Sequence, residues 1–335
     1  MALGLVGCGS RLVVPRPSVH AQTMIPKAMS LCLALALALG ARDAGAVASS
    51  SPENAPGDFA VPPVPYRITN HGRVLNYRIP AVSLGQAAHS VRVFVPPGYS
   101  DPANRSRHYP VVYLLHGWPG GDGNWAGHGH LLQTLDSLYA TGRIPEVIVV
   151  MPSGAGVGFL GRSFYLNSYD GKSRMEDFIA NDLVSWVDAS FRTHADSAHR
   201  AIIGCSEGAS GALNVAFQHP EVFGACAGHS GEYELRSDIG ISKVLGPEPG
   251  ATRLLAENSP SLYAPRIAEQ IKHQTIYFDI GLKEGSLKDN RALDRELNTL
   301  GVPHTYHEAR GRHSWRYWRA HVHESLVVCL SGMRD

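Results

Sequence analysis

The chain has 335 residues, of which 44% are hydrophobic and 18% are charged, a composition typical of a folded globular protein rather than a disordered one. Its 30 Lys and Arg residues nearly balance its 29 Asp and Glu residues, so the formal net charge is only +1. This balance excludes the broad positive surface that non-specific binding to nucleic acid requires. The length is compatible with one large α/β domain.

The first part of the chain has the pattern of an export signal. Residues 28–39 form an unbroken apolar run that follows Lys27 and leads to the small residues AGA at 44–46. A positive flank, a short apolar core and a small-residue exit are typical of a secretory signal peptide. The run is shorter than the roughly 20 residues that a spanning helix needs. We therefore expect a targeting segment over residues 1–46, cleaved near Ala46, no stable membrane span, and a secreted or periplasmic protein.

The folded region is expected to follow a linker. Residues 47–72 contain a serine run and several prolines, which is the composition of an extended linker. The sequence then alternates between short apolar runs and longer amphipathic ones, so we predict one domain over residues 73–335. Met24 and Met29 are alternatives to Met1 as the first residue of the chain.

Short runs of apolar residues without polar alternation predict strands that are buried on both faces. These runs are residues 91–95, 111–115, 147–151, 201–204, 223–227, 275–280 and 305–307. Apolar stripes at helical spacing predict helices over residues 174–191 and 286–300, and a last helix is expected over 315–330. The alternation predicts an α/β fold, with a mostly parallel central sheet and helices on both faces. Ligands bind such sheets beyond the carboxyl ends of the strands.

A G-x-S-x-G motif, GCSEG at residues 204–208, lies between a predicted strand and a run of small residues typical of a helix. A serine on such a strand-to-helix turn has its hydroxyl raised at the edge of the sheet. Glycines on either side allow the strand and the helix to approach closely. Ser206 is therefore the candidate nucleophile.

A serine hydroxyl needs a positioned base, and in this architecture the partners follow in the order serine, acid, histidine. His313 lies after the last predicted strand and before the last predicted helix, which makes it the candidate base. The acid is expected in the loop after the preceding strand. Glu284 is the leading candidate there, followed by Asp289 and then Asp279.

A tetrahedral intermediate also needs hydrogen-bond donors for its oxyanion. The backbone N–H of Glu207, after the nucleophile, is one candidate, and that of Trp118, in the glycine-rich loop after residues 111–115, is the other. Aromatic residues near the motifs either line a substrate pocket or pack in the core; they are Trp125, Phe164, Tyr165 and Trp315. His128 and His130 have no third ligand at suitable spacing, so we predict no metal and no cofactor.

Three segments carry a family resemblance: PVVYLLHGWPGG, RAIIGCSEGASGALNVAFQHPEVFGACAGHSG and GVPHTYHEARGRHSWRYW. They resemble the putative-esterase branch of the α/β-hydrolases, which includes S-formylglutathione hydrolases, feruloyl and enterochelin esterases, and mycobacterial mycolyltransferases. The resemblance runs from about residue 73 to about residue 330 and implies an α/β-hydrolase fold. It assigns the nucleophile to Ser206, the base to His313, the acid to Glu284, and the oxyanion donors to Trp118 and Glu207.

The chain departs from the family pattern at two of these positions. Glu207 stands where the branch often has an apolar residue, and a carboxylate that pointed into the oxyanion site would oppose catalysis. We therefore expect its side chain to pair elsewhere. Glu284 stands where the acid is often aspartate, so that assignment is less direct than the other two.

The leading hypothesis is a secreted serine esterase that hydrolyses carboxylic esters through an acyl-enzyme. Its substrate would be a small-molecule ester or an ester linked to a glycolipid or polysaccharide. One alternative is an acyltransferase similar to the mycolyltransferases, in which a sugar or glycerol hydroxyl replaces water. Another is a non-catalytic binding protein on a hydrolase scaffold. Residues 232–265, between two predicted strands, are expected to form a cap over the pocket.

Overall fold

The structure, a computed structural model, describes residues 71–237 and 240–333. The expected targeting segment, and the expected linker apart from its last two residues, lie outside the described residues. Within the part of the chain that is described, no helix has both the length and the apolar character needed to cross a membrane.

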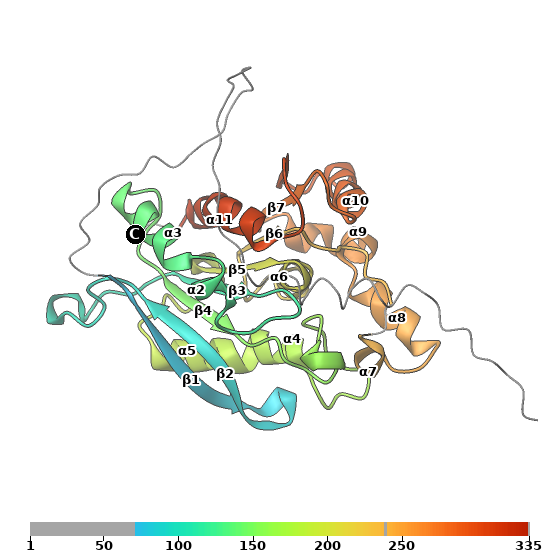
Figure 1. Cartoon of the computed structure of the whole chain (residues 1–335), viewed down its shortest axis with the longest axis horizontal. Coiled ribbons are helices and arrows are strands. Elements are labelled where there is room, and N and C mark those ends of the chain that lie inside the picture. Colours follow the sequence, from blue (N-terminus) through green and yellow to red (C-terminus); the bar gives the residue numbers. More distant parts are fainter. Residues whose placement is uncertain (1–70, 238–239, 334–335) are drawn as a thin grey trace, which may run out of the picture. The chain divides into compact units, whose positions relative to one another are not determined.

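An eight-stranded sheet organises the domain, with the strand order β1-β2-β4-β3-β5-β6-β7-β8 (Figure 1). β1 pairs antiparallel with β2, and β2 pairs antiparallel with β4, whereas all the other neighbouring strands are parallel. The strands are Arg73–Ala81 (β1), Gln86–Val95 (β2), Val111–Leu115 (β3), Ile148–Pro152 (β4), Arg200–Cys205 (β5), Ala225–His229 (β6), Thr275–Gly281 (β7) and Thr305–Ala309 (β8). The mostly parallel sheet that the sequence predicts is therefore confirmed.

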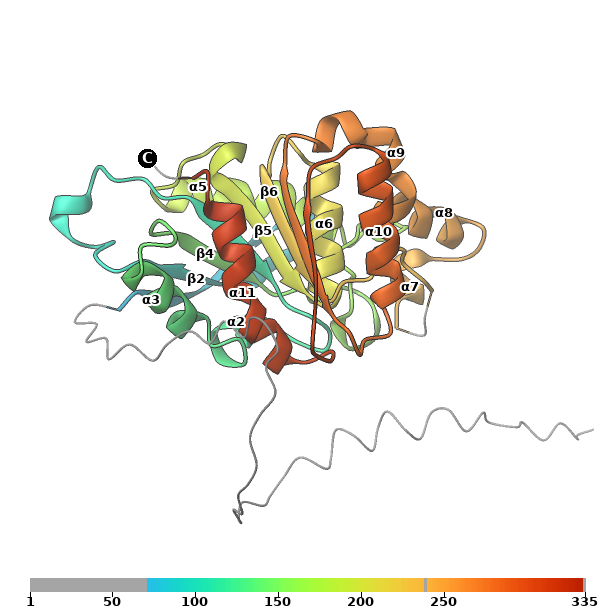
Figure 2. The ribbon, with the colours of Figure 1, turned by 90° about the horizontal axis from the view of Figure 1, so that it is seen from above.

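Helices cover both faces of the sheet. The helices of the described part of the chain are Asn124–Gly127 (α2), Leu131–Ala140 (α3), Met175–Asp177 (α4), Val184–Ser190 (α5), Glu207–Gln218 (α6), Ser242–Leu245 (α7), Gly250–Glu257 (α8), Pro260–Ile271 (α9), Leu287–Thr299 (α10) and Trp315–Leu330 (α11). Figure 2 shows β5 and β6 between α11 on one side and α6 on the other.

Alternate residues of the central strands belong to two different hydrophobic clusters. In β3, Val111, Tyr113 and Leu115 pack in the cluster that includes residues of α5, α6 and α10. Val112 and Leu114 pack instead in the cluster that includes residues of α3 and α11. Because successive side chains of a strand point to opposite faces, a wholly apolar strand serves both clusters at once.

Several elements differ from the predicted ones, and three of these differences have a clear physical reason. β1 is absent from the prediction because it is an edge strand in which buried and exposed residues alternate. The helix predicted over residues 174–191 is interrupted by a π-helical stretch, Phe178–Leu183, between α4 and α5. β6 begins two residues later than predicted because the N–H of Phe223 bonds to the carbonyl of His219 in a turn.

Candidate active site

The nucleophile candidate lies on a tight turn between β5 and α6. Ser206 has φ of 56° and ψ of −126°, a conformation that non-glycine residues rarely adopt. A Cβ at Gly204 would come within 2.0 Å of the carbonyl oxygen of Gly208, so only glycine permits the strand and helix to approach this closely. The turn is therefore the strained strand-to-helix elbow that the G-x-S-x-G motif predicts.

Three of the predicted site residues form a continuous hydrogen-bonded chain. Ser206 Oγ lies 2.7 Å from His313 Nε2, and His313 Nδ1 lies 2.7 Å from Glu284 Oε2. An ionised carboxylate only accepts hydrogen bonds, so Nδ1 carries the proton and Nε2 is left to accept from the serine hydroxyl. This order of contacts, hydroxyl to imidazole to carboxylate, is the one that general-base activation of a serine requires.

Backbone hydrogen bonds hold the loops that carry the acid and the base side by side. The N–H of Leu282 donates to the carbonyl of Ala309 at 2.8 Å, and that of Lys283 donates to Gly311 at 3.1 Å. The loop after β7 is thus bonded to the loop after β8. This pairing brings Glu284 next to His313 although 29 residues separate them in the sequence.

Further hydrogen bonds fix the orientation of the Glu284 carboxylate. Its Oε1 accepts from Ser230 Oγ at 2.8 Å and from the N–H of Gly281 at 3.1 Å. Trp318 Nε1 donates to Ser230 Oγ at 3.0 Å, and the Trp318 ring meets the His313 ring edge to face at 5.0 Å. The sequence analysis did not identify Ser230 or Trp318, although Trp318 lies in the quoted GRHSWRYW segment.

The two alternative acids are placed elsewhere. Asp289 Oδ1 pairs with Arg236 at 2.8 Å. Asp279 is fully buried, and its Oδ2 lies 2.8 Å from His229 Nδ1. Burial acts to raise the pKa of Asp279, but the charge and hydrogen bond of His229 outweigh it, so that pKa lies below its usual range. Of the three candidates, Glu284 is therefore the one in contact with His313.

A second serine–histidine–carboxylate series is formed by Ser325, His229 and Asp279. His229 Nε2 is 2.9 Å from Ser325 Oγ, while its Nδ1 contacts Asp279 as described above. Ser325, His229 and Asp279 all have 0% exposure. The series connects β6, β7 and α11 inside the protein, directly next to Ser230, and its burial gives a substrate no access to it.

The loop after β3 passes close to the nucleophile. A Cβ on Gly117 would lie 2.8 Å from Ser206 Cβ and 3.4 Å from Ser206 Oγ. His116 anchors this loop, because its Nε2 accepts from the N–H of Gly154 at 2.8 Å and its carbonyl accepts from Tyr165 Oη at 2.7 Å. Burial lowers the pKa of His116, which keeps the imidazole neutral in this role. Trp118 follows directly in the loop.

Glu207 pairs away from the nucleophile, as the sequence analysis expects. Its Oε2 accepts from Arg162 Nε at 2.8 Å, and its Oε1 accepts from the N–H of Phe164 at 2.9 Å. Burial raises the pKa of the Glu207 carboxyl, and the hydrogen bond and charge of Arg162 oppose that effect. The sequence analysis gave no role to Arg162.

The aromatic candidates divide between the core and the surface. Trp125 and Tyr165 are each 1% exposed, and Trp125 Nε1 donates to the carbonyl of Leu115 at 2.9 Å. Phe164 is 3% exposed and packs with residues of α7 and α8. For these three the structure favours core packing, which was the alternative to a substrate pocket. Trp315 is partly exposed and contacts Trp125 edge to face.

The expected cap segment contains α7, α8 and the start of α9. Five of its buried apolar residues pack with Phe164 and Leu166 in a small separate cluster: Leu235, Ile241, Val244, Leu245 and Ala251. Tyr233, Tyr263 and Ala264 pack instead in the large core cluster. The N–H of Phe159 donates to the carbonyl of Gly240 at 3.0 Å, which connects the segment to the loop before Arg162. That the segment covers bound substrate stays a prediction.

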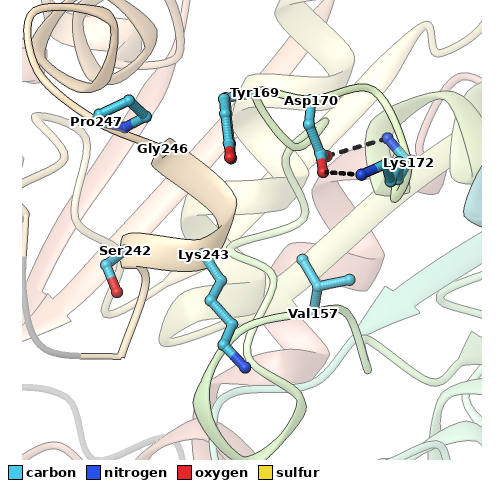
Figure 3. Close-up of a pocket in the computed structure, with 8 residues that line it drawn as sticks. All are labelled: Val157, Tyr169, Asp170, Lys172, Ser242, Lys243, Gly246 and Pro247. Carbon is cyan, nitrogen blue, oxygen red and sulfur yellow. Dashed lines mark hydrogen bonds and ion pairs between the residues drawn. The ribbon is translucent and has the colours of Figure 1, made fainter.

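A shallow pocket of about 480 Å³ lies beside α7 (Figure 3). Its eight lining residues are Val157, Tyr169, Asp170, Lys172, Ser242, Lys243, Gly246 and Pro247, and they include none of the Ser206–His313–Glu284 chain. Lys172 and Asp170, both on its wall, pair with each other at 3.3 Å.

The residues that could hold a metal ion are not those considered from the sequence. Among the described residues, Glu176, Asp177 and His219 bring their ligand atoms within 4.8 Å of one another. His219 Nε2 contacts Glu176 Oε1 at 3.1 Å, and Asp177 pairs with Arg174. Glu176 and His219 therefore pair with each other, whereas Asp177 pairs with Arg174. His130, by contrast, contacts Arg319 at 3.2 Å.

The strand order, the elbow and the hydroxyl–imidazole–carboxylate series together define an α/β-hydrolase. A family model described as "Putative esterase" matches residues 83–327, and the chain belongs to this family. The predicted membership of the putative-esterase branch is thus confirmed.

Several curated proteins are similar in sequence. Esterase Rv1288 from Mycobacterium tuberculosis is 30% identical over 278 residues, which cover 75% of this chain and 58% of that protein. An endo-1,4-beta-xylanase/feruloyl esterase from Xylanibacter ruminicola is 32% identical over 159 residues, which cover 46% of this chain and 21% of that protein. This chain thus corresponds to little more than half the length of Esterase Rv1288.

Solved structures share the fold. A ferulic acid esterase superposes with a TM-score of 0.70 at 24% identity, and the match covers 79% of this chain and all of that one. FphF, a fluorophosphonate-binding serine hydrolase from Staphylococcus aureus, superposes with a TM-score of 0.65 at 17% identity, with 79% and 100% coverage.

Proposed function

We propose that the protein is a secreted serine esterase that hydrolyses carboxylic esters through an acyl-enzyme intermediate. The observation that carries this proposal is the chain of two 2.7 Å contacts joining Ser206, His313 and Glu284 at the carboxyl edge of the sheet. Membership of the putative-esterase family supports the same reaction class.

In the first half-reaction, Ser206 Oγ attacks the ester carbonyl carbon while His313 Nε2 takes the hydroxyl proton. Glu284 holds the imidazole in the required tautomer and stabilises the imidazolium. The backbone N–H groups of Trp118 and Glu207 donate to the oxyanion of the tetrahedral intermediate. His313 then gives its proton to the leaving alcohol as the C–O bond breaks.

In the second half-reaction, His313 removes a proton from water as the water attacks the carbonyl carbon of the acyl-enzyme. His313 then returns this proton to Ser206 Oγ as the bond between Oγ and the acyl carbon breaks, which releases the carboxylic acid and free Ser206. The side chain of His313 is 48% exposed, so water reaches the base directly. This exposure favours hydrolysis over acyl transfer, since efficient transfer requires that water be kept from the acyl-enzyme.

The open base and the partly exposed Trp118 and Trp315 fit an ester that is presented from outside the protein. Substrates of this kind include small soluble esters and acyl or aryl groups linked to a polysaccharide or glycolipid. Hydrolysis rates over short-acyl, long-acyl and aromatic esters would rank these classes.

Replacing Ser206 with alanine tests the mechanism. Ser206→Ala should lower kcat for p-nitrophenyl acetate by about 10⁶-fold, because the nucleophile is lost while the fold is kept. Ser210→Ala is the matched control: Ser210 lies one turn further along α6, and its Oγ accepts from the N–H of Glu232 at 2.9 Å. Turnover retained in pure Ser206→Ala protein would refute the proposal.

Two further readouts separate the alternatives. A fluorophosphonate should label the wild type and not Ser206→Ala, whereas a non-catalytic binding protein would not be labelled at all. Addition of glycerol or trehalose should leave free acid as the main product. Acylated glycerol or trehalose as the main product would instead identify an acyltransferase.

Export is proposed from the sequence alone. Cleavage after Ala46 would give a secreted protein whose first residue is Val47. The intact mass of protein recovered outside the cytoplasm checks this expectation. A cytoplasmic protein that retains residues 28–39 would contradict it.

A further inference from the structure

A single arginine side chain contacts both residues that are proposed to supply the oxyanion donors. Arg162 Nε donates to Glu207 Oε2 at 2.8 Å, and the Arg162 guanidinium carbon lies 4.8 Å from the centre of the Trp118 ring. The same guanidinium carbon lies 4.0 Å from the centre of the Phe164 ring. The Arg162 side chain is 13% exposed, so these contacts are made largely out of water.

Glu207 is an unusual neighbour for a site that stabilises negative charge. The Glu207 side chain is 6% exposed, and the backbone N–H of the same residue is one of the two proposed oxyanion donors. An unpaired carboxylate at this depth would repel an oxyanion forming beside it, since few waters would screen the two charges. The guanidinium of Arg162 neutralises this carboxylate.

The backbone of Trp118 must be held in one orientation if its backbone N–H is to serve as an oxyanion donor. It lies on a loop that touches Ser206 through Gly117, and its ring is partly exposed. An arginine stacked on an aromatic ring is attracted to the ring face. The planar guanidinium can do this while its edge bonds to a carboxylate, which a lysine ammonium cannot match.

We propose that Arg162 is a positioning residue of the oxyanion site, which neutralises the carboxylate of Glu207 and holds the Trp118 loop against the elbow. In this role Arg162 acts through these two residues and not on the reacting atoms themselves. The inference rests on the proposed esterase function and adds to it a residue outside the Ser206–His313–Glu284 series. It also explains how the family fold accepts a glutamate directly after the nucleophile.

Arg162 could affect the site in two ways, by packing the Trp118 loop or by neutralising Glu207, and substitution of Arg162 alone does not separate them. If Arg162 only packs the loop, replacing it lowers kcat by the same factor whether or not residue 207 carries a charge. If it neutralises Glu207, its loss is harmful chiefly because an ionised carboxylate remains. Removal of that charge by a second substitution should then restore much of the rate.

The experiment compares the full-length wild type, Arg162→Met, Glu207→Gln and the double variant, with kcat and KM measured separately on p-nitrophenyl acetate. Arg162→Met should lower kcat by about 10–100-fold, somewhat less than the loss of an oxyanion donor, with little change in KM. The double variant should have a kcat at least about fivefold higher than that of Arg162→Met, because charged residues in contact show a coupling of this size. The kcat of Glu207→Gln alone should lie between that of the wild type and that of Arg162→Met.

A kcat for Arg162→Met equal to that of the wild type, or a double variant no faster than Arg162→Met, would overturn the proposal. Thermal denaturation checks that each variant is folded. If Arg162→Met does not fold, Arg162→Gln and its double variant with Glu207→Gln provide the same comparison, because glutamine keeps a donor without the charge. A wild type inactive on every ester would refute the esterase function itself, which is a separate outcome.

Discussion

Glu284 uses its two carboxylate oxygens for different tasks. Oε2 contacts His313, whereas Oε1 accepts from Ser230 and from the N–H of Gly281. A glutamate has one more rotatable bond than the aspartate that is common at this position, so it needs more contacts to hold one orientation. Ser230 supplies such a contact and is itself held by Trp318, which also packs on the His313 ring.

Glu284→Gln should lower kcat by about 10⁴-fold with little change in stability, because an amide in contact with Nδ1 favours the wrong imidazole tautomer. Steady-state kinetics on p-nitrophenyl acetate measures the effect. Asp289→Asn is the matched control, since Asp289 pairs with Arg236 rather than His313, and its kcat should stay close to that of the wild type. Equal losses in the two variants would refute the assignment of the acid.

The two ends of helix α6 have different roles. Its N-terminus follows Ser206, where the partial positive charge of the helix favours developing negative charge. Its C-terminus is followed by His219, whose ring contacts Glu176 at 3.1 Å and Glu221 at 3.4 Å. The hydrogen bond to Glu176 raises the pKa of His219 above its usual value.

This shift predicts a pH-dependent contribution of His219 to stability. The protonated ring is favoured in the folded state, so its contribution is fully present below the pKa of an unfolded histidine, about 6.5. It is lost as the pH rises through the higher folded pKa. His219→Gln should therefore lower the unfolding free energy by on the order of 1 kcal/mol at about pH 5.5, and by much less at about pH 9. Urea denaturation measures this difference, and an equal loss at both pH values would contradict the expectation.

Across the whole molecule, burial is deepest in the middle of the sheet. Every residue of β3, β5 and β6 is buried, whereas β1 and β8 at the two edges are largely half-exposed or exposed. The central strands are also paired on both sides, and the elbow that carries Ser206 begins at the end of β5. Ser206 is thus attached to the most buried part of the sheet.

Hydrogen exchange followed by mass spectrometry should therefore find the slowest amides in β3, β5 and β6 and faster ones in β1 and β8. The six central-to-edge comparisons are internal controls, because all the strands are measured in one sample. Exchange in β5 as fast as in β1 would contradict a core centred on these strands.

The parts of this molecule that depend on local sequence were predictable. The apolar run at 111–115 has the bounds of β3, and the helix expected over 315–330 has those of α11. The elbow, His313 and Glu284 could be located from the sequence because each follows a strand, and parallel strands end at one edge of the sheet. β1 was missed because an edge strand has no continuous apolar run.

The supporting residues were not predictable, because their roles depend on contacts between distant loops. Arg162 is 45 residues from Glu207, Ser230 is 54 from Glu284, and Trp318 is 88 from Ser230. No spacing rule connects such pairs. The departure at Glu207 was itself a usable signal, since a glutamate beside a nucleophile requires a cationic partner somewhere in the fold.

The sealed arrangement of Ser325, His229 and Asp279 has a consequence for anyone who searches structures with a catalytic template. Distance criteria alone would return two matches in this molecule, one whose histidine is about half exposed and one whose three residues have no exposure. Reactive probes would nevertheless modify only the former. Accessibility, rather than interatomic spacing, separates an enzyme centre from its internal look-alike.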